Sequence, residues 1–192
     1  SSKVTAVACG HTATDEQIFQ ALKDATDPLE RSWERLGRAK KIAIKFNQDF
    51  APEHVIVRHG HRQQLVSDPV VRATLRLLQQ RTQAELLAVD VGVEGGHRSR
   101  EMCTTIMPIL NEFGVRYLDG RIAPVKWTEV PGGGLLFRRY PLPAESVEAD
   151  EIISVQTVKN HRFAGVTLSM KNLFGLSALA PAGRPRSYYH HL

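Results

Sequence analysis

The sequence predicts an α/β fold, a layered sandwich in which helices flank a mostly parallel central sheet. Short apolar runs alternate with segments of helical periodicity along most of the 192 residues, which is typical of β-α-β units. The apolar fraction of 42% suffices for a core, and no apolar run approaches the roughly 18 residues that span a bilayer. We therefore expect one α/β domain over residues 1–192 and no membrane span.

The N-terminal part predicts one strand and an interrupted helix. Lys3–Ala8 has the composition of a short strand. Residues 14–17 read Thr-Asp-Glu-Gln, which fits a capping box because a Thr is followed three residues later by Gln. Apolar residues then recur at helical spacing from Ile18 to Leu36, and Asp27-Pro28 interrupts or restarts that helix.

The remaining elements follow in alternation. Further helices are expected from Asp68-Pro69, over residues 100–113 and from about Val166 to Leu173. Residues 124–143 contain Gly-Gly-Gly between two extended runs and predict a β-hairpin insertion. Residues 47–67 lack periodicity and hold three histidines, so we expect a loop over the site. The other strands are expected at residues 41–46, 86–91, 115–118 and 152–158, the last as a central strand.

Several predicted strands end in a polar side chain. In open α/β sheets, ligands bind beyond the carboxyl ends of the strands. Lys45 and Asn47 end the second strand, Asp90 ends the third, and Lys159-Asn160-His161 ends the fifth. Asp119-Gly120 ends the fourth, but Asp-Gly is an ordinary turn pair. Lysine is not a turn residue, so Lys45 and Lys159 favour a site.

Positive charge is concentrated in the C-terminal fifth of the chain. Residues 152–192 contain no Asp and no Glu, and their five Lys and Arg side chains account for the net charge of +5. This favours a small anion or an acidic partner surface. The alternative is an ordinary segment whose acidic neighbours come from elsewhere in the sequence.

The predicted helix after Gly165 has two kinds of face. At about 100° per residue, Val166, Met170, Leu173 and Phe174 share one face and are expected in the core. Thr167 and Lys171 are four residues apart and are expected together on one flank. Gly165 would let a ligand approach the first turn, whose backbone N–H groups suit phosphate or carboxylate. The side chains expected to bind this ligand are Lys159, His161, Arg162, Thr167, Lys171, Asn172 and, near the C-terminus, His190.

Other chemistries have weaker support. No set of His, Asp and Glu has a diagnostic metal spacing, and His161 has the best functional case among the histidines because of its place. Cys9 and Cys103 could be paired or free, and no Cys-x-x-Cys exists, so we expect no zinc ribbon or iron–sulfur cluster held by this chain alone. P-loop, dinucleotide and Gly-x-Ser-x-Gly motifs are absent.

The stretch VKNHRFAGVTLSMKNLFGL resembles the Lys-x-His … Val-Thr-x-x-x-Lys-Asn-x-x-Gly signature of the domain-of-unknown-function family three-six-two. IAIKFN, SDPVVRATLRLL, VEADEIISV and the final YYHHL resemble further segments of the family, in order over about residues 40–192. The resemblance implies a shared site at Lys45, Asn47, Lys159, His161, Thr167, Lys171 and Asn172. It names no reaction.

This chain also departs from the family that it resembles. Family members continue past the Tyr-His, so we expect the fold here to lack their C-terminal part, or a partner chain or oligomer to complete it. Many relatives carry a ferredoxin-like iron–sulfur module for which this chain has no cysteines. Relatives without that module resemble exported proteins with a twin-arginine leader, which implies an extracytoplasmic protein after leader removal.

Two functional hypotheses remain open. In the first, the domain binds a small anionic ligand or cofactor. The candidate catalytic residues are then Lys159, His161 and Lys171, with one lysine as base or nucleophile and His161 as general acid/base. Lys45, Asn47, Asp90, Arg162, Thr167, Asn172 and His190 would bind the ligand. In the second, the basic C-terminal segment docks an acidic partner without catalysis. Nucleic acid is not favoured, because no recognised motif is present.

Overall fold

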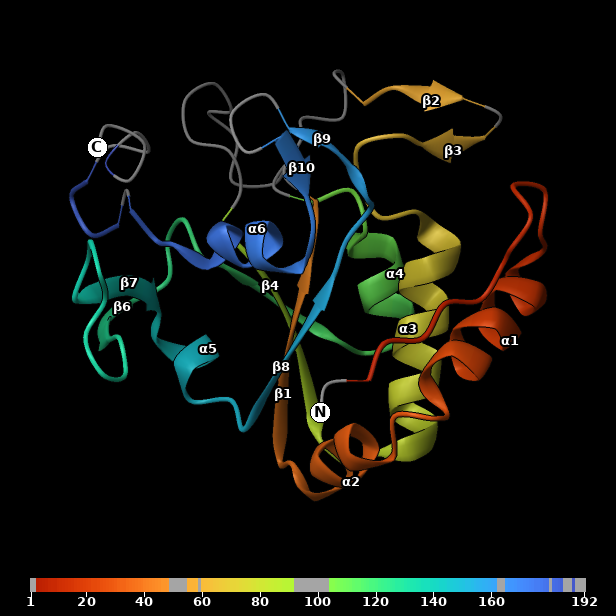
Figure 1. Ribbon diagram of the computed structural model, residues 1–192, viewed down its shortest axis with the longest axis horizontal. Coiled ribbons are helices and arrows are strands. Elements are labelled where there is room, and N and C mark those ends of the chain that lie inside the picture. Colours follow the sequence, from red (N-terminus) through yellow and green to blue (C-terminus); the bar gives the residue numbers. More distant parts are fainter. Residues whose placement is uncertain are drawn as a thin grey trace.

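The computed structural model describes residues 3–48, 55–58, 60–91, 104–161, 165–179, 181–184 and 188. At its centre lies a four-stranded sheet in which all neighbouring strands are parallel, in the order β5-β4-β1-β8 (Figure 1). This confirms the predicted α/β fold. The strands are β1 (Lys41–Phe46), β4 (Glu85–Asp90), β5 (Arg116–Asp119) and β8 (Glu151–Val155).

Helices cover one face of this sheet (Figure 1). The main core cluster joins β1 and β4 to α3 (Asp68–Arg81) and α4 (Met107–Glu112), and α2 (Glu30–Arg38) packs at its edge through Trp33 and Leu36. A smaller cluster joins α1 (Asp15–Thr26) to the outer side of α3. These two clusters place the bulk of the apolar burial on one side.

The opposite face is covered by shorter elements. Leu176 and Leu142 pack there over Ala43 and Val89. They come from the 3₁₀ turn η3 (Phe174–Leu176) and from the hairpin of β6 (Val125–Glu129) and β7 (Arg139–Pro143), which confirms the predicted insertion. The helices α5 (Ala144–Val147) and α6 (Ser169–Leu173) complete this layer.

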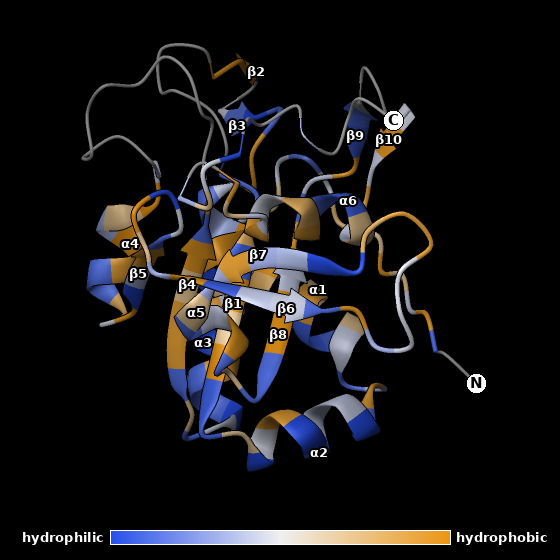
Figure 2. Cartoon of the chain, turned by 90° about the vertical axis from the view of Figure 1, so that its left-hand side faces the viewer, coloured by the Kyte–Doolittle hydropathy of each residue, from blue (hydrophilic) through white to orange (hydrophobic). Residues whose placement is uncertain are grey.

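Strand β1 explains how the sheet positions a polar group. All of its apolar residues are buried, as expected for a parallel strand covered on both faces, and Figure 2 shows β1 and β4 largely hydrophobic. Ile42 and Ile44 belong to the α3 side, whereas Ala43 belongs to the opposite side. Because side chains alternate along a strand, Lys45 points to the same side as Ala43, toward α6 and η3.

Two of the predicted helix starts are confirmed, those of α1 and α3. The Thr14 hydroxyl accepts from the Gln17 backbone N–H, and the Gln17 side chain accepts from the Thr14 N–H, so both halves of the capping box form. Asp27-Pro28 separates α1 from α2, and Pro69 lies in the first turn of α3.

Two predicted elements were wrong, one at the N-terminus and one in the middle of the chain. Lys3–Ala8 forms no strand; it runs beside the end of α1, where the Thr5 hydroxyl donates to the Ala25 carbonyl instead of the backbone joining a sheet. The helix expected over residues 100–113 begins only at Met107, because Pro108 occupies its first turn and residues 105–106 form a turn. Residues 100–103 lie outside the described part.

The C-terminal third differs most from expectation. Strand β8 ends at Val155 and lies at the sheet edge, not in its centre. The next segment forms an antiparallel hairpin of β9 (Lys159–His161) and β10 (Gly165–Thr167), where a helix was expected from Val166. Gly165 has a φ of 71°, and β-branched Val166 and Thr167 suit a strand. A second small hairpin, β2 (Val57–Arg58) and β3 (His61–Arg62), forms within the predicted loop.

The expected apolar stripe of that helix is consequently not core. Met170 is 87% exposed, and Val166 and Leu173 are exposed as well. Of the four residues expected on that face, only Phe174 is half-buried and so is compatible with packing. The spacing of these residues matched a helix that the chain does not form.

Glu145 of α5 ties two strands together at the amino end of the sheet. Its carboxylate accepts from Arg116 of β5, with Nη1 2.9 Å away, and from the Lys41 ammonium of β1 at 3.1 Å. The Arg116 hydrogen bonds, followed by those of Lys41, lower the pKa of Glu145 from 4.5 to about 2. The carboxylate therefore stabilises the fold above its unfolded pKa, and this contribution is lost as the pH falls through about 2.

We expect Glu145→Gln to lower the free energy of unfolding by about 1–2 kcal/mol at pH 7, since the pair is partly exposed and screened. The difference from the unaltered protein should shrink as the pH falls from 5 to 2. Urea unfolding at a series of pH values measures it. Glu112→Gln, which removes the partner of Arg72 at a more exposed position, is the matched control and should cost at most about 1 kcal/mol. A pH-independent cost for Glu145→Gln would contradict the assignment.

Candidate functional site

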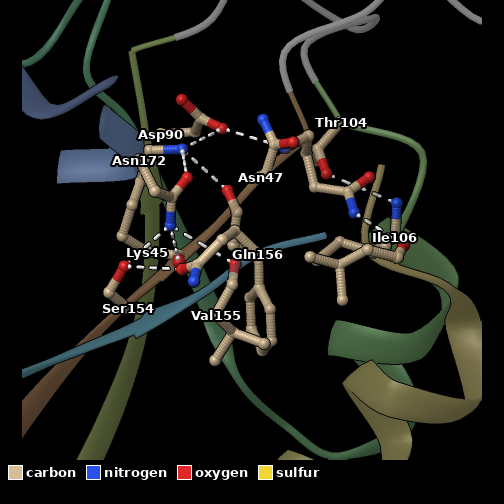
Figure 3. A network of polar contacts seen from close by, with 12 residues as sticks. Lys45, Asn47, Asp90, Thr104, Ile106, Ser154, Val155, Gln156 and Asn172 are labelled. Atoms are coloured by element: carbon tan, nitrogen blue, oxygen red, sulfur yellow. Dashed lines mark hydrogen bonds and ion pairs between the residues drawn. The ribbon is translucent and has the colours of Figure 1, made fainter. Parts of the chain in front are cut away.

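A buried ion pair lies at the carboxyl end of the two central strands. The Lys45 ammonium of β1 is 2.8 Å from Oδ2 of Asp90, the last residue of β4, and both side chains are at most 2% exposed (Figure 3). The same ammonium donates to the Phe46 carbonyl at 2.8 Å and to Oδ1 of Asn172 at 3.3 Å. Adjacent parallel strands that end together thus bring the two charges into contact.

Asn172 holds α6 against the Lys45–Asp90 pair through hydrogen bonds. Its amide Nδ2 donates to the Lys45 carbonyl and to the Ser154 hydroxyl, each at 3.0 Å, and its Oδ1 accepts from the Lys45 ammonium (Figure 3). The side chain is 4% exposed. Both ends of the amide are therefore satisfied by β1 and β8, which fixes the orientation of the short helix above the sheet.

Lys159 approaches the same edge from β9. Its ammonium donates to Oδ1 of Asn47 at 2.7 Å and to the Gln64 carbonyl. Asn47 follows β1 directly, and its backbone N–H donates to Val155 at the end of β8. The hairpin is in this way tied to the carboxyl end of the sheet, and β9 and β10 lie beyond that end in Figure 1.

Thr167 of β10 lies directly opposite Lys159 in the hairpin register. Directly opposed residues of an antiparallel pair place their side chains on the same face. Thr167 is 4% exposed, whereas its neighbours Val166 and Leu168 are each about half exposed, so the Lys159–Thr167 face points inward. The Thr167 hydroxyl is buried and has no hydrogen-bond partner among the described residues. Such a group costs free energy unless something binds it.

Two residues that sequence reasoning missed complete the network. Gln48, 1% exposed, donates its backbone N–H to Asp90 at 3.2 Å, and its Oε1 accepts from Thr105 at 2.8 Å. Gly175 lies against the ion pair: a Cβ there would be 2.5 Å from Cε of Lys45. Gln48 begins an aperiodic segment, so no pattern marked it. The glycine within Lys-Asn-Leu-Phe-Gly was visible as part of the motif but not as a contact.

The structure brings most of the predicted residues together and separates others. Lys45, Asn47, Asp90, Lys159, Thr167 and Asn172 converge at one edge. Thr167 and Lys171 do not share a helix flank, because Thr167 lies in a strand, and the Lys171 ammonium lies 4.4 Å from the centre of the Phe174 ring. The expected helix start after Gly165 is therefore wrong, because α6 begins only at Ser169. His161 is placed by its backbone in β9, while Arg162, His190, His54 and His59 lie outside the described residues.

Asp119 has a local partner. It is held by Arg121, whose Nη2 lies 2.8 Å from Oδ2. Cys9 is an exposed free thiol, and Cys103 falls outside the described residues. Within the described ranges, no three His, Cys, Asp or Glu side chains gather as metal ligands. None of the helices described there is long and apolar enough to cross a bilayer.

A family model with the description "Domain of unknown function (DUF362)" matches residues 42–192. The chain belongs to this family. The match begins within β1 and includes every candidate residue named above, so the converging edge lies wholly within the DUF362 region. No significantly similar sequence was found among curated proteins, and no significantly similar fold among solved structures. The description of DUF362 assigns no reaction, so the function must be argued from the site.

Proposed function

We propose that this DUF362 domain binds a small anionic ligand, a phosphate or a carboxylate, between the β9–β10 hairpin and the carboxyl end of the sheet. The observation that carries the proposal is the Thr167 hydroxyl, which is buried directly opposite Lys159 and has no hydrogen-bond partner in the part of the chain that the structure describes. A hydroxyl in such a place is explained by a ligand oxygen that accepts its hydrogen bond. The adjacent lysine supplies the positive charge that an anion needs.

The chemistry around the hydroxyl supports an anion. The Lys159 ammonium places a positive charge beside the hydroxyl, and it donates to Oδ1 of Asn47 and to the Gln64 carbonyl. Lys45 and Asp90 form a neutral pair at the floor, and Asn172 donates beside it. The site also lies where ligands bind in open parallel sheets, beyond the carboxyl ends of neighbouring strands. Lys159 and His161 remain the candidates for any catalytic step on the bound ligand; Lys171, over Phe174, is a weaker one.

Thr167→Val tests the proposal because it replaces this hydroxyl with a methyl group and leaves the shape of the side chain nearly unchanged. We expect this variant to be at least as stable as the unaltered protein, since no hydrogen bond of the described residues is lost. Affinity for the ligand should fall by about five- to tenfold. Isothermal titration with inorganic phosphate, lactate and a nucleotide, alongside urea unfolding, gives both quantities.

Thr157→Val is the matched control. The Thr157 hydroxyl donates to the Leu65 carbonyl at 2.9 Å, so its loss should cost about 1 kcal/mol of stability and leave ligand affinity unchanged. A destabilised Thr167→Val would mean that the hydroxyl has a partner in the protein. Absence of any anion binding to the unaltered protein would overturn the proposal.

A second candidate function, docking of an acidic partner, is favoured by one surface. The outer side of the hairpin and α6 exposes Val158, Val166, Leu168 and Met170. It belongs to the segment 152–192, which has no acidic residue. Contiguous exposed apolar residues with one sign of charge are typical of protein interfaces. Salt-sensitive binding of an acidic protein that Val166→Ser/Met170→Ser abolishes, without anion binding, would favour this function over the first.

A further inference from the structure

A cavity lies apart from the candidate site, between the N-terminal arm and the helical layer. Its volume is about 690 Å³, within the range of roughly 300–1,000 Å³ typical of ligand pockets. The walls come from the arm (residues 7–11), α1, the β2–β3 hairpin and Val70 of α3. None of the residues assigned to the candidate site lines it.

The floor of this cavity is one face of α1. It consists of Ile18, Ala21, Leu22 and Ala25, spaced three, four and seven residues from the first, as one helix face requires. The two alanines leave the depression between the larger side chains. The arm is held beside the helix by two hydrogen bonds, from the Thr5 hydroxyl to the Ala25 carbonyl and from the Lys3 ammonium to the Pro28 carbonyl at 3.0 Å.

The rim is basic. Arg58, His61 and His11 line it, and the described residues that line it include no Asp or Glu. The Arg58 guanidinium has no hydrogen bond or ion pair with any other described residue, in contrast to Arg62 of the same hairpin, which pairs with Asp68 at 2.8 Å. Because residues 1–151 are neutral as a whole, the excess of basic over acidic side chains among these lining residues is a local feature.

An apolar floor with a cationic rim selects one class of ligand. A phosphate or a metal ion would leave the floor unused, and a hydrocarbon would leave Arg58 unpaired. We infer that this cavity binds a monocarboxylate with an apolar chain, whose chain lies on α1 and whose carboxylate meets Arg58. An arginine is suited to this role because its two parallel N–H groups match the two carboxylate oxygens.

Calorimetric titration of the full chain with octanoate and with 1-octanol at pH 7.5 tests the inference. Octanoate should bind more tightly than octanol, and Arg58→Gln should weaken octanoate by about tenfold while leaving octanol unchanged, since a charge-assisted hydrogen bond is lost. Ala21→Phe, which fills the floor, should abolish binding of both.

Arg138→Gln is the matched control, because it removes the same charge from an exposed position in the β6–β7 connection, away from the cavity. It should leave both affinities unchanged. Equal effects of Arg58→Gln and Arg138→Gln on octanoate would overturn the inference, as would undiminished binding in Ala21→Phe or a complete lack of binding to the unaltered protein. Urea unfolding of each variant confirms that it is folded.

Discussion

Asp90→Ala is expected to lower the free energy of unfolding by about 3–5 kcal/mol, because it leaves the Lys45 ammonium buried without its carboxylate. The remaining acceptors, the Phe46 carbonyl and Asn172 Oδ1, are neutral and cannot replace a charge. Lys45 is 1% exposed, so water does not reach it. The midpoint of urea unfolding at pH 7 measures the loss.

Two comparisons make this expectation specific. Glu16→Ala removes the partner of Arg76, where the carboxylate is 69% exposed, and should cost at most about 1 kcal/mol. The double variant Lys45→Met/Asp90→Leu removes both charges and should recover most of the stability lost by Asp90→Ala, since apolar side chains can replace a buried pair. A cost below 1 kcal/mol for Asp90→Ala would show that the pair is hydrated in solution.

The same energetics bear on function. A buried ion pair contributes little net stability over an apolar pair of similar volume, because desolvation offsets the attraction. The fold therefore does not need charges at the ends of β1 and β4. These charges lie within reach of Asn172 and near Lys159, which supports our proposal that this edge binds a ligand. The fixed and neutral Lys45–Asp90 pair would form the floor of the site and orient the side chains above it.

The convergence of the site was predictable from the sequence. Lys45 and Asp90 end apolar runs, and strands that alternate with helices form a parallel sheet whose carboxyl ends share one edge. These two facts suffice to place Lys45, Asn47 and Asp90 together without any structure. The starts of α1 and α3 were equally accessible, because the capping box and Pro69 act through their immediate neighbours.

The arrangement after β8 was not predictable in the same way. Val166, Met170 and Leu173 have helical spacing, but this spacing has no consequence when the residues face solvent. The hairpin depends instead on Gly165, whose positive φ allows the turn back from β9, and on Lys159 reaching Asn47 across 112 positions of sequence. Contacts of that separation leave no local pattern, and the same holds for Gln48 with Thr105.

Gly175→Ala is expected to lower the free energy of unfolding by about 2–3 kcal/mol, because the new methyl group would overlap Lys45. An ideal Cβ at Gly175 would lie 2.5 Å from Cε and 2.9 Å from Nζ of Lys45, and 3.3 Å from Oδ1 of Asp90. Neither side can yield easily. The Gly175 carbonyl accepts from the Val91 N–H at 2.9 Å, and the lysine end is held by Asp90 and Asn172. Urea unfolding measures the loss.

The cost should depend on the ion pair, and a double-mutant cycle detects this dependence. In the background Lys45→Ala/Asp90→Ala the obstructing atoms are gone, so Gly175→Ala should there be nearly neutral. Gly37→Ala is the control for the change itself: no atom lies within 4 Å of its Cβ position in α2, and it should gain up to about 1 kcal/mol from helix propensity. An equal cost for Gly175→Ala in both backgrounds would mean that the backbone, not the ion pair, requires glycine, and the close approach of η3 to Lys45 would then have no part in holding the site.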